Sequence, residues 1–116
     1  MRAFLTLLLL VASITGPLAA EFRTGAVMQV KPNSIWFEDA AKLTEWQRRK
    51  KGRSGAAFAS YQRSVLSERA ALQFINPMTV KVLGYERGKN QVTVELQTTG
   101  RLQGSKWVLD AGAFQR

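Results

Sequence analysis

Residues 34–52 read SIWFEDAAKLTEWQRRKKG, and within them the sequence changes from the period of a strand to that of a helix. Residues 34–37 are β-prone, and Asp39 suits the N-cap of a helix that Gly52 ends. The positions that follow at helical spacing are Ala40, Leu43, Trp46 and Gln47. The basic residues before Gly52 lie at the negative end of the helix dipole, which they complement. We therefore predict a strand that leads directly into a helix.

Upstream of this segment, the sequence predicts a second strand. Residues 26–30 are β-prone, and Lys31-Pro32-Asn33 separates them from residues 34–37 with the chemistry of a turn. Pro32 presets its own φ, and Asn33 tolerates a left-handed turn position. We therefore predict that the two runs pair as a hairpin.

Downstream, a second helix is predicted to start near Ser54 or Gly55. Its apolar stripe consists of Phe58, Tyr61, Val65, Leu66 and Leu72. Asn76-Pro77 ends it at the latest, because the residue before a proline disfavours the α region. Residues 71–75 suit either its last turn or the start of an extended segment.

The last third of the sequence predicts three strands in a meander. Residues 92–97 alternate between apolar and polar side chains, as a half-buried strand does, and residues 86–90 precede them with a turn. The whole is predicted to be α+β, with about five short strands and a helical pair inserted between the first hairpin and the C-terminal meander. Because an open sheet would leave two exposed edges, we expect a small antiparallel barrel or a strongly bent sheet.

The stretch GSKWVLDAGAF, residues 104–114, resembles the close of SH3-like barrels. In that family a glycine, a tryptophan–valine strand and a short turn ending in an apolar residue seal the last strand. The resemblance implies an SH3-like barrel that serves as a binding platform, and the helical pair departs from it. The whole sequence also resembles small exported bacterial proteins, a likeness that implies no function.

The first twenty residues have the three-part design of a secretory signal peptide. Arg2 supplies the positive start, residues 3–12 the apolar core, and Leu18-Ala19-Ala20 the small-residue exit. The alternative is a membrane anchor, but the apolar run is shorter than the ~20 residues of a spanning helix, and Gly16-Pro17 interrupts it. We predict cleavage after Ala20, export to the periplasm or the medium, and one basic domain over residues 21–116.

Two missing residue types exclude several kinds of site. Without histidine the chain lacks the usual general base, metal ligand and pH switch, and without cysteine it lacks thiol nucleophiles, thiolate zinc sites and disulfides. We therefore predict no metal site, no cofactor and no catalytic residue, and favour a protein that is not an enzyme. The alternative is a small hydrolase or carbohydrate-active domain with converging carboxylates. The carboxylates available to it are Glu38, Asp39, Glu68, Glu86, Glu95 and Asp110.

Five cations occupy six consecutive positions at the end of the first predicted helix, in a chain of formal net charge +9. They are Arg48, Arg49, Lys50, Lys51 and Arg53. Such a run is typical of anion binding. In an exported protein its partner would be an anionic envelope glycolipid, an anionic phospholipid surface or an acidic protein, and export disfavours nucleic acid. The alternatives are a solvated helix end that is basic without a function, and a processing site at the paired basic residues.

Two tryptophans are candidates for an aromatic contact. Trp46 lies one turn before the basic run and is predicted in the core, with stacking on a ligand as the alternative. Trp36 lies on the opposite face of its strand from Ile35 and Phe37, so an open face there would be a ligand groove or a protein interface. Covering of that strand by the helices is the simpler prediction.

Two classes of function follow. The first is an exported non-enzymatic binding module that contacts an anionic partner through residues 48–53. The second is the carboxylate-based hydrolase. Two carboxylates converging in a concave pocket would favour the second, whereas a convex basic helix end without such a pocket would favour the first.

Overall fold

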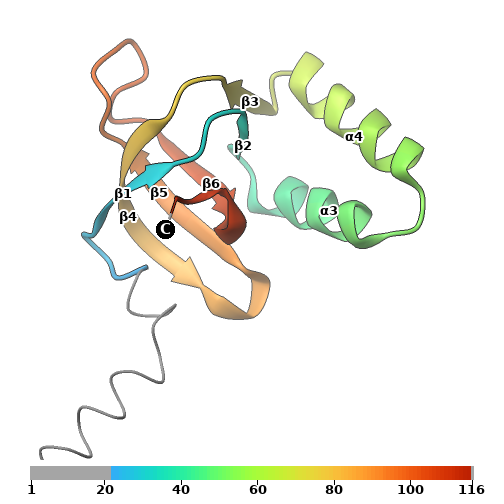
Figure 1. Ribbon diagram of the computed structural model, residues 1–116, viewed down its shortest axis with the longest axis horizontal. Coiled ribbons are helices and arrows are strands. Elements are labelled where there is room, and N and C mark those ends of the chain that lie inside the picture. The colour runs from blue at the N-terminus through green and yellow to red at the C-terminus, as the bar shows by residue number, and fades with distance from the viewer. Residues whose placement is uncertain (1–21, 116) are drawn as a thin grey trace, which may run out of the picture.

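The computed structural model describes residues 22–115, which form an antiparallel sheet of six strands and two helices (Figure 1). The strands are β1 (Val27–Val30), β2 (Ser34–Phe37), β3 (Ala71–Phe74), β4 (Met78–Glu86), β5 (Gln91–Leu96) and β6 (Lys106–Asp110). The helices are α3 (Ala40–Lys51) and α4 (Gly55–Ser67), and short 3-10 turns η1 (Arg87–Lys89) and η2 (Ala111–Ala113) follow β4 and β6. The fold is α+β, as predicted. The predicted signal peptide lies outside the described residues.

Both helices begin where their capping residues predict. The Asp39 side chain accepts a hydrogen bond from a backbone N–H of the first turn of α3 (2.8 Å), and the Gly52 N–H bonds back to the last turn (3.1 Å). The Ser54 hydroxyl caps α4 in the same way (3.0 Å). Neither helix within residues 22–115 has the length and apolar character required to cross a membrane.

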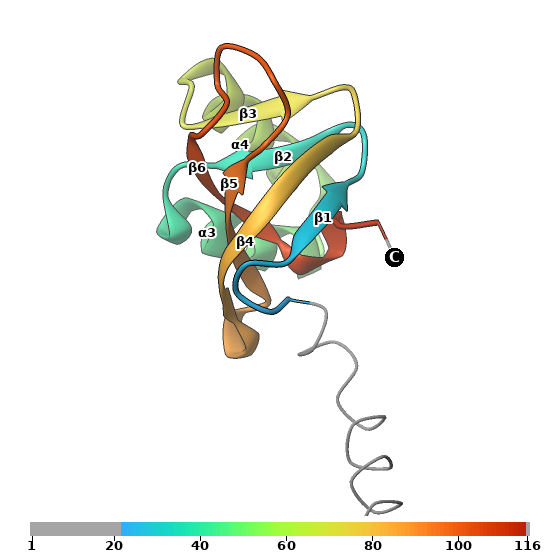
Figure 2. The ribbon, with the colours of Figure 1, turned by 90° about the vertical axis from the view of Figure 1, so that its left-hand side faces the viewer.

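The strands lie in the order β1-β4-β5-β6-β2-β3. The meander of β4, β5 and β6 confirms the prediction for the last third of the chain. The sheet has six strands where about five were expected, because residues 71–74 are extended and pair with β2 as β3. A register shift between Val82 and Gly84 bends β4, and Figure 2 shows β1 and β4 crossing β2 and β3 obliquely. The order has two ends, so the sheet of the described residues is not closed.

The predicted first hairpin is wrong, because β1 and β2 do not pair with each other. β1 pairs with β4, and β2 pairs with β3 and β6. The turn between them does form, with Asn33 in the left-handed region at φ 65°. However, the Lys31 N–H bonds to the Ala113 carbonyl (2.8 Å) and the Asn33 N–H to the Phe74 carbonyl (2.7 Å). The local turn chemistry therefore sets a change of direction, and distant segments decide which strands pair.

Strand β2 separates two hydrophobic cores. Trp36 lies in the larger core inside the bent sheet, whereas Ile35 and Phe37 face a smaller core that α3 and α4 cover. The alternation predicted for this strand is confirmed, and so is its covering by the helices. Trp36 is 0% exposed and packs against Phe74 and Trp107. Trp36 therefore offers no surface to a ligand. The prediction that it could be an aromatic contact is wrong.

A buried amide network joins α3 to the sheet. Gln91, at the start of β5, is 4% exposed and donates to the Thr44 hydroxyl (2.8 Å) and to the Gln47 side-chain carbonyl (3.1 Å). The Gln47 amide in turn donates to Oδ1 of Asp110 (2.7 Å). Since buried polar groups are costly unless they are paired, this network fixes the position of the helix on the sheet.

Candidate functional site

The two arginines of the predicted anion-binding run are held by a carboxylate on their own helix. Glu45 lies one turn before them and forms ion pairs with both Arg48 and Arg49. The Arg48 Nε donates to Oε1 of Glu45 at 3.0 Å. The Arg49 guanidinium also lies over the Tyr61 ring of α4, 4.9 Å from its centre. Much of the charge of the two arginines is therefore compensated within the helical pair.

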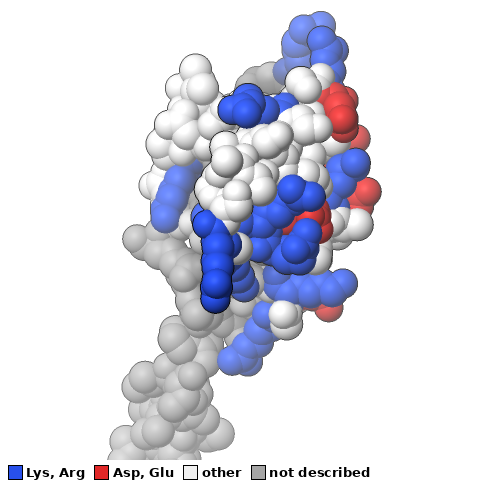
Figure 3. All heavy atoms as spheres, turned by 90° about the vertical axis from the view of Figure 1, so that its right-hand side faces the viewer, with Lys and Arg blue, Asp and Glu red and all other residues white. Residues whose placement is uncertain are grey.

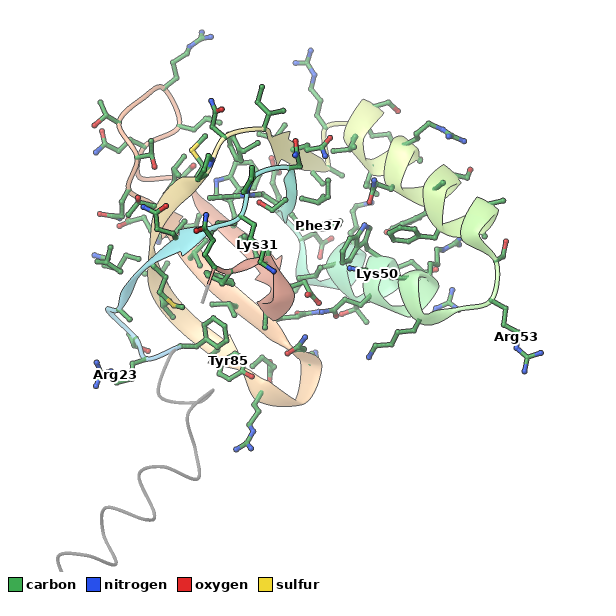
Figure 4. All side chains as sticks on the ribbon, in the orientation of Figure 1. Arg23, Lys31, Phe37, Lys50, Arg53 and Tyr85 are labelled. Carbon is green, nitrogen blue, oxygen red and sulfur yellow. The ribbon has the colours of Figure 1, made fainter. Side chains whose placement is uncertain are left out.

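The remaining cations of the run point in different directions. Lys50 lies over the ring of Trp46, with its Nζ 4.8 Å from the ring centre. Arg53 lies at the connection between α3 and α4 and points away from the sheet (Figure 4). Within residues 22–115, Lys50, Lys51 and Arg53 form no ion pair. The five predicted residues thus share one end of α3 without converging on a single point.

The environment of Glu45 has a measurable consequence. Hydrogen bonds from Arg48, and then from Arg49, lower the pKa of Glu45 from 4.5 to about 2. Because the pKa of Glu45 is lowered in the folded protein, its ionised carboxylate stabilises the folded state. This stabilisation is complete above pH 4.5 and is lost as the pH falls through about 2.

We expect the difference in urea midpoint between the wild-type protein and E45Q to shrink as the pH falls from 4.5 to about 2. Urea unfolding followed by circular dichroism across this interval measures it. E86Q, at an exposed carboxylate at the end of β4, is the control and should follow the wild type throughout. A gap between wild type and E45Q that stays constant over the interval would contradict the pairing.

A groove of about 360 Å³ lies between the helical pair and the sheet. One wall is the turn between β1 and β2 together with η2, and the other consists of α3 and α4. Lys31 comes from the first wall and Lys50 from the second, and their side chains extend into the space between sheet and helices from opposite sides (Figure 4). Trp46 and Phe58 supply the aromatic lining, with ring centres 5.5 Å apart and planes tilted by 57°.

The polar side chains of the groove include both donors and acceptors. The Gln62 side-chain oxygen accepts the indole N–H of Trp46 (2.9 Å), whereas the Gln62 amide nitrogen has no hydrogen-bond partner among the described residues. Asp110 is the single carboxylate in this lining. Its Oδ1 accepts from Gln47 (2.7 Å) and its Oδ2 from the Gly112 N–H (2.8 Å). The groove therefore presents two ammonium groups, an unpaired amide donor and one hydrogen-bonded carboxylate.

The face formed by the helices is basic. Figure 3 shows lysine and arginine side chains gathered on the face that the helices form, with fewer acidic ones between them. The ion pairs among residues 22–115 are those of Glu45 with its two arginines and that of Lys81 with Glu95 (3.6 Å). Lys31 and Lys50 thus face the groove without a carboxylate partner in this part of the chain.

Four of the six carboxylates considered for a hydrolase, Asp39, Glu68, Glu95 and Asp110, have separate local partners. Asp39 caps α3, Glu68 accepts a hydrogen bond from Ser64 (3.1 Å), and Glu95 pairs with Lys81. Three hollows formed by the described residues are each lined by at most one carboxylate. Residues 22–115 also hold no group of three or more acidic side chains that could bind a metal ion. The converging pair that a glycosidase requires is not present at these hollows.

A second hollow has a different character. It measures about 560 Å³ and lies where the β3–β4 connection meets the loop between β5 and β6. Its lining includes Phe74, Met78, Leu96 and Leu102, with Arg101 as the charged residue among those that line it. It lacks the opposed cations that distinguish the groove beside α3.

Several residues of the groove were not predicted from the sequence. Lys31 was assigned only to a turn and Phe58 only to an apolar stripe, while Gln62 and Gln73 drew no attention. Trp46 was predicted in the core, and at 8% exposed it is there, yet its ring also borders the groove. The spacing of these residues carries no signal, because folding alone brings the turn, the helices and β3 together. Comparisons of the chain with protein-family models, with curated proteins and with solved structures found no match.

Proposed function

We propose that this chain is an exported, non-enzymatic binding module that holds an anionic partner at the C-terminal end of α3. The proposal rests on the excess positive charge at that end. Among the described residues, Glu45 is the one carboxylate that forms ion pairs with any of the five cations of this run. The helix dipole offsets part of the repulsion between these cations, and an anionic partner offsets more. Lys50 extends this charged surface into a concave site, because it lines the groove together with Lys31.

The partner follows from the predicted export. An anionic envelope glycolipid, an anionic phospholipid surface and an acidic protein each present the multivalent negative charge that the end of α3 would bind. Nucleic acid would satisfy the same electrostatics, but an exported protein meets it rarely.

We also propose that the fold is an SH3-like, partly open barrel. The connection from β1 to β4 would hold β2, the helical pair and β3. Two features support this. The meander β4–β5–β6 is followed by the 3-10 turn η2, and the chain then returns to β1, where Phe114 bridges Val30. β1 therefore lies between β4 and the residues after η2. By analogy, SH3-like barrels serve mostly as binding platforms.

A binding assay with a charge-neutral variant tests the function. Residues 21–116 contain every helix and strand described above, and the variant replaces Arg48, Arg49, Lys50, Lys51 and Arg53 with glutamine. Both proteins are titrated with anionic vesicles, envelope glycolipid and a soluble polyanion across a salt series. We expect the variant to bind about tenfold more weakly or worse, with a shallower salt dependence.

The control variant removes the same number of charges elsewhere. It replaces Arg63, Arg69, Arg87, Lys89 and Arg101 with glutamine. Retention of most of the binding in this control supports a site at the end of α3. Equal loss in the two variants, or equal binding by all three proteins, would overturn the proposed function.

A further inference from the structure

The groove between Lys31 and Lys50 combines charge, aromatic surface and a free donor in one place. We infer that it binds an anionic saccharide, a sugar ring that carries a carboxylate or a phosphate, with the anion between the two lysines. This inference rests on the proposed function, because it places part of the anionic partner at Lys50. It goes further by naming the chemistry that the groove selects.

The size of the groove fits a small ligand. Its volume of about 360 Å³ falls at the lower end of the ~300–1,000 Å³ typical of small-molecule sites. Such sites combine apolar lining with a few placed polar groups. The groove has this composition, with aromatic rings from both helices and polar side chains from the sheet side.

The charged end of the ligand has a defined place. Lys31 and Lys50 line opposite sides, and neither is ion-paired within residues 22–115 (Figure 4). Asp110 keeps its negative charge, but its oxygens accept hydrogen bonds from Gln47 and Gly112, and it forms no ion pair with either lysine within residues 22–115. A lysine ammonium acts as a compact charge with three donors, which accommodates a carboxylate or a phosphate equally.

The neutral part of the ligand also has partners. The half-buried ring of Phe58 offers apolar surface to the C–H face of a sugar ring. Trp46, which is 8% exposed and has Lys50 over its ring, adds only its edge to this lining. The free amide nitrogen of Gln62 donates toward a hydroxyl oxygen. A simple inorganic anion would use the lysines and leave these groups without a contact.

An acidic peptide fits the groove less well. Extended peptides gain affinity from free backbone N–H and C=O groups along their binding site. In this wall the N–H groups of Lys31 and Asn33 are bonded to Ala113 and Phe74, and Pro32 has no N–H. The side chains of the groove, rather than its backbone, are available to a ligand.

The indole N–H of Trp46 reports on the groove directly, because it donates to Gln62 (2.9 Å). The indole of Trp107 donates to the Ser105 hydroxyl, which does not line the groove, and serves as the internal reference. The indole of Trp36 is not used in this way, because its acceptor, Ser34, lines the groove. In NMR titrations of residues 21–116, galacturonic acid and glucose 6-phosphate should shift the Trp46 signal and leave the Trp107 signal unchanged. We expect their Kd values to be about tenfold lower than those of glucose and inorganic phosphate. The first two probes distinguish a carboxylate from a phosphate as the preferred anion.

Two variants complete the test. K31Q should weaken both acidic sugars about tenfold, and Q62L should reduce the preference for them over inorganic phosphate. K89Q, outside the groove, should bind as the wild type does, and unchanged Trp107 signals show that each variant is folded.

Two results would overturn the inference and leave the proposed function standing. These are inorganic phosphate binding as tightly as the acidic sugars, and a triglutamate peptide binding more tightly than they do, each with vesicle binding retained. Failure of the proposed function is a separate result. In that case vesicles and polyanion would bind the wild type and the charge-neutral variant of α3 equally well.

Discussion

Replacing Trp36 with alanine is expected to lower the free energy of unfolding by about 3–5 kcal/mol. The side chain is 0% exposed, and its ring centre lies 4.7 Å from that of Phe74 and 6.3 Å from that of Trp107. Its removal leaves a cavity at the strand that both cores share. Because small domains are stable by only ~5–15 kcal/mol, the variant should be close to its unfolding transition at room temperature.

Urea unfolding followed by circular dichroism measures this loss. V27A is the control, because Val27 is 66% exposed at the edge of β1, and surface substitutions of this kind change stability within about 0.5 kcal/mol. W36F should fall between the two, since it keeps most of the packing but loses the hydrogen bond to Ser34 (2.9 Å). A loss below about 1 kcal/mol for W36A would contradict the place of Trp36 in the core.

Reversing both lysines of the groove is expected to weaken acidic sugars about 100-fold or more. In the double variant Lys31→Glu/Lys50→Glu, a carboxylate or phosphate ligand meets two negative groups where it met two positive ones. Like charges in contact at a binding site cost several kcal/mol. The Trp46 indole signal, titrated with galacturonic acid, measures the change.

The matched control carries the same change in net charge at positions outside the groove, Lys89→Glu/Arg101→Glu. This variant should retain binding within about threefold at moderate salt, because neither residue lines the groove and salt screens exposed charges. Equal weakening by the two double variants would mean that the overall charge of the protein, and not the groove, governs binding.

Features that depend on neighbours in sequence were predictable. The caps of α3 at Asp39 and Gly52 were predicted from residue type alone, because both satisfy backbone groups of the adjacent turn. The alternation of Val92, Val94 and Leu96 likewise predicted a strand with one buried face, and all three are buried. The spacing of Glu45 to Arg48 and Arg49 was also visible, and it could have predicted their ion pairs.

Features that depend on distant partners were not predictable from one sequence. Lys31-Pro32-Asn33 is a turn in either case, and nothing within it shows that β1 pairs with β4 rather than with β2. The sequence of residues 71–74 is compatible with a helix or a strand, and pairing with β2 makes it a strand. The groove has the same origin, since Lys31 and Lys50 meet only after the turn, η2 and the helices are in place.

The pairing of β1 has a consequence for the timing of folding. Its partners, β4 on one side and Phe114 on the other, are synthesised only after β2, both helices and β3. Contacts this remote in sequence require long loops to close, and chains rich in them fold slowly. Strand β1 can therefore form its pairs only after most of the domain has been synthesised. For a chain predicted to leave the cytoplasm, this delay would favour its transport across the membrane before it folds.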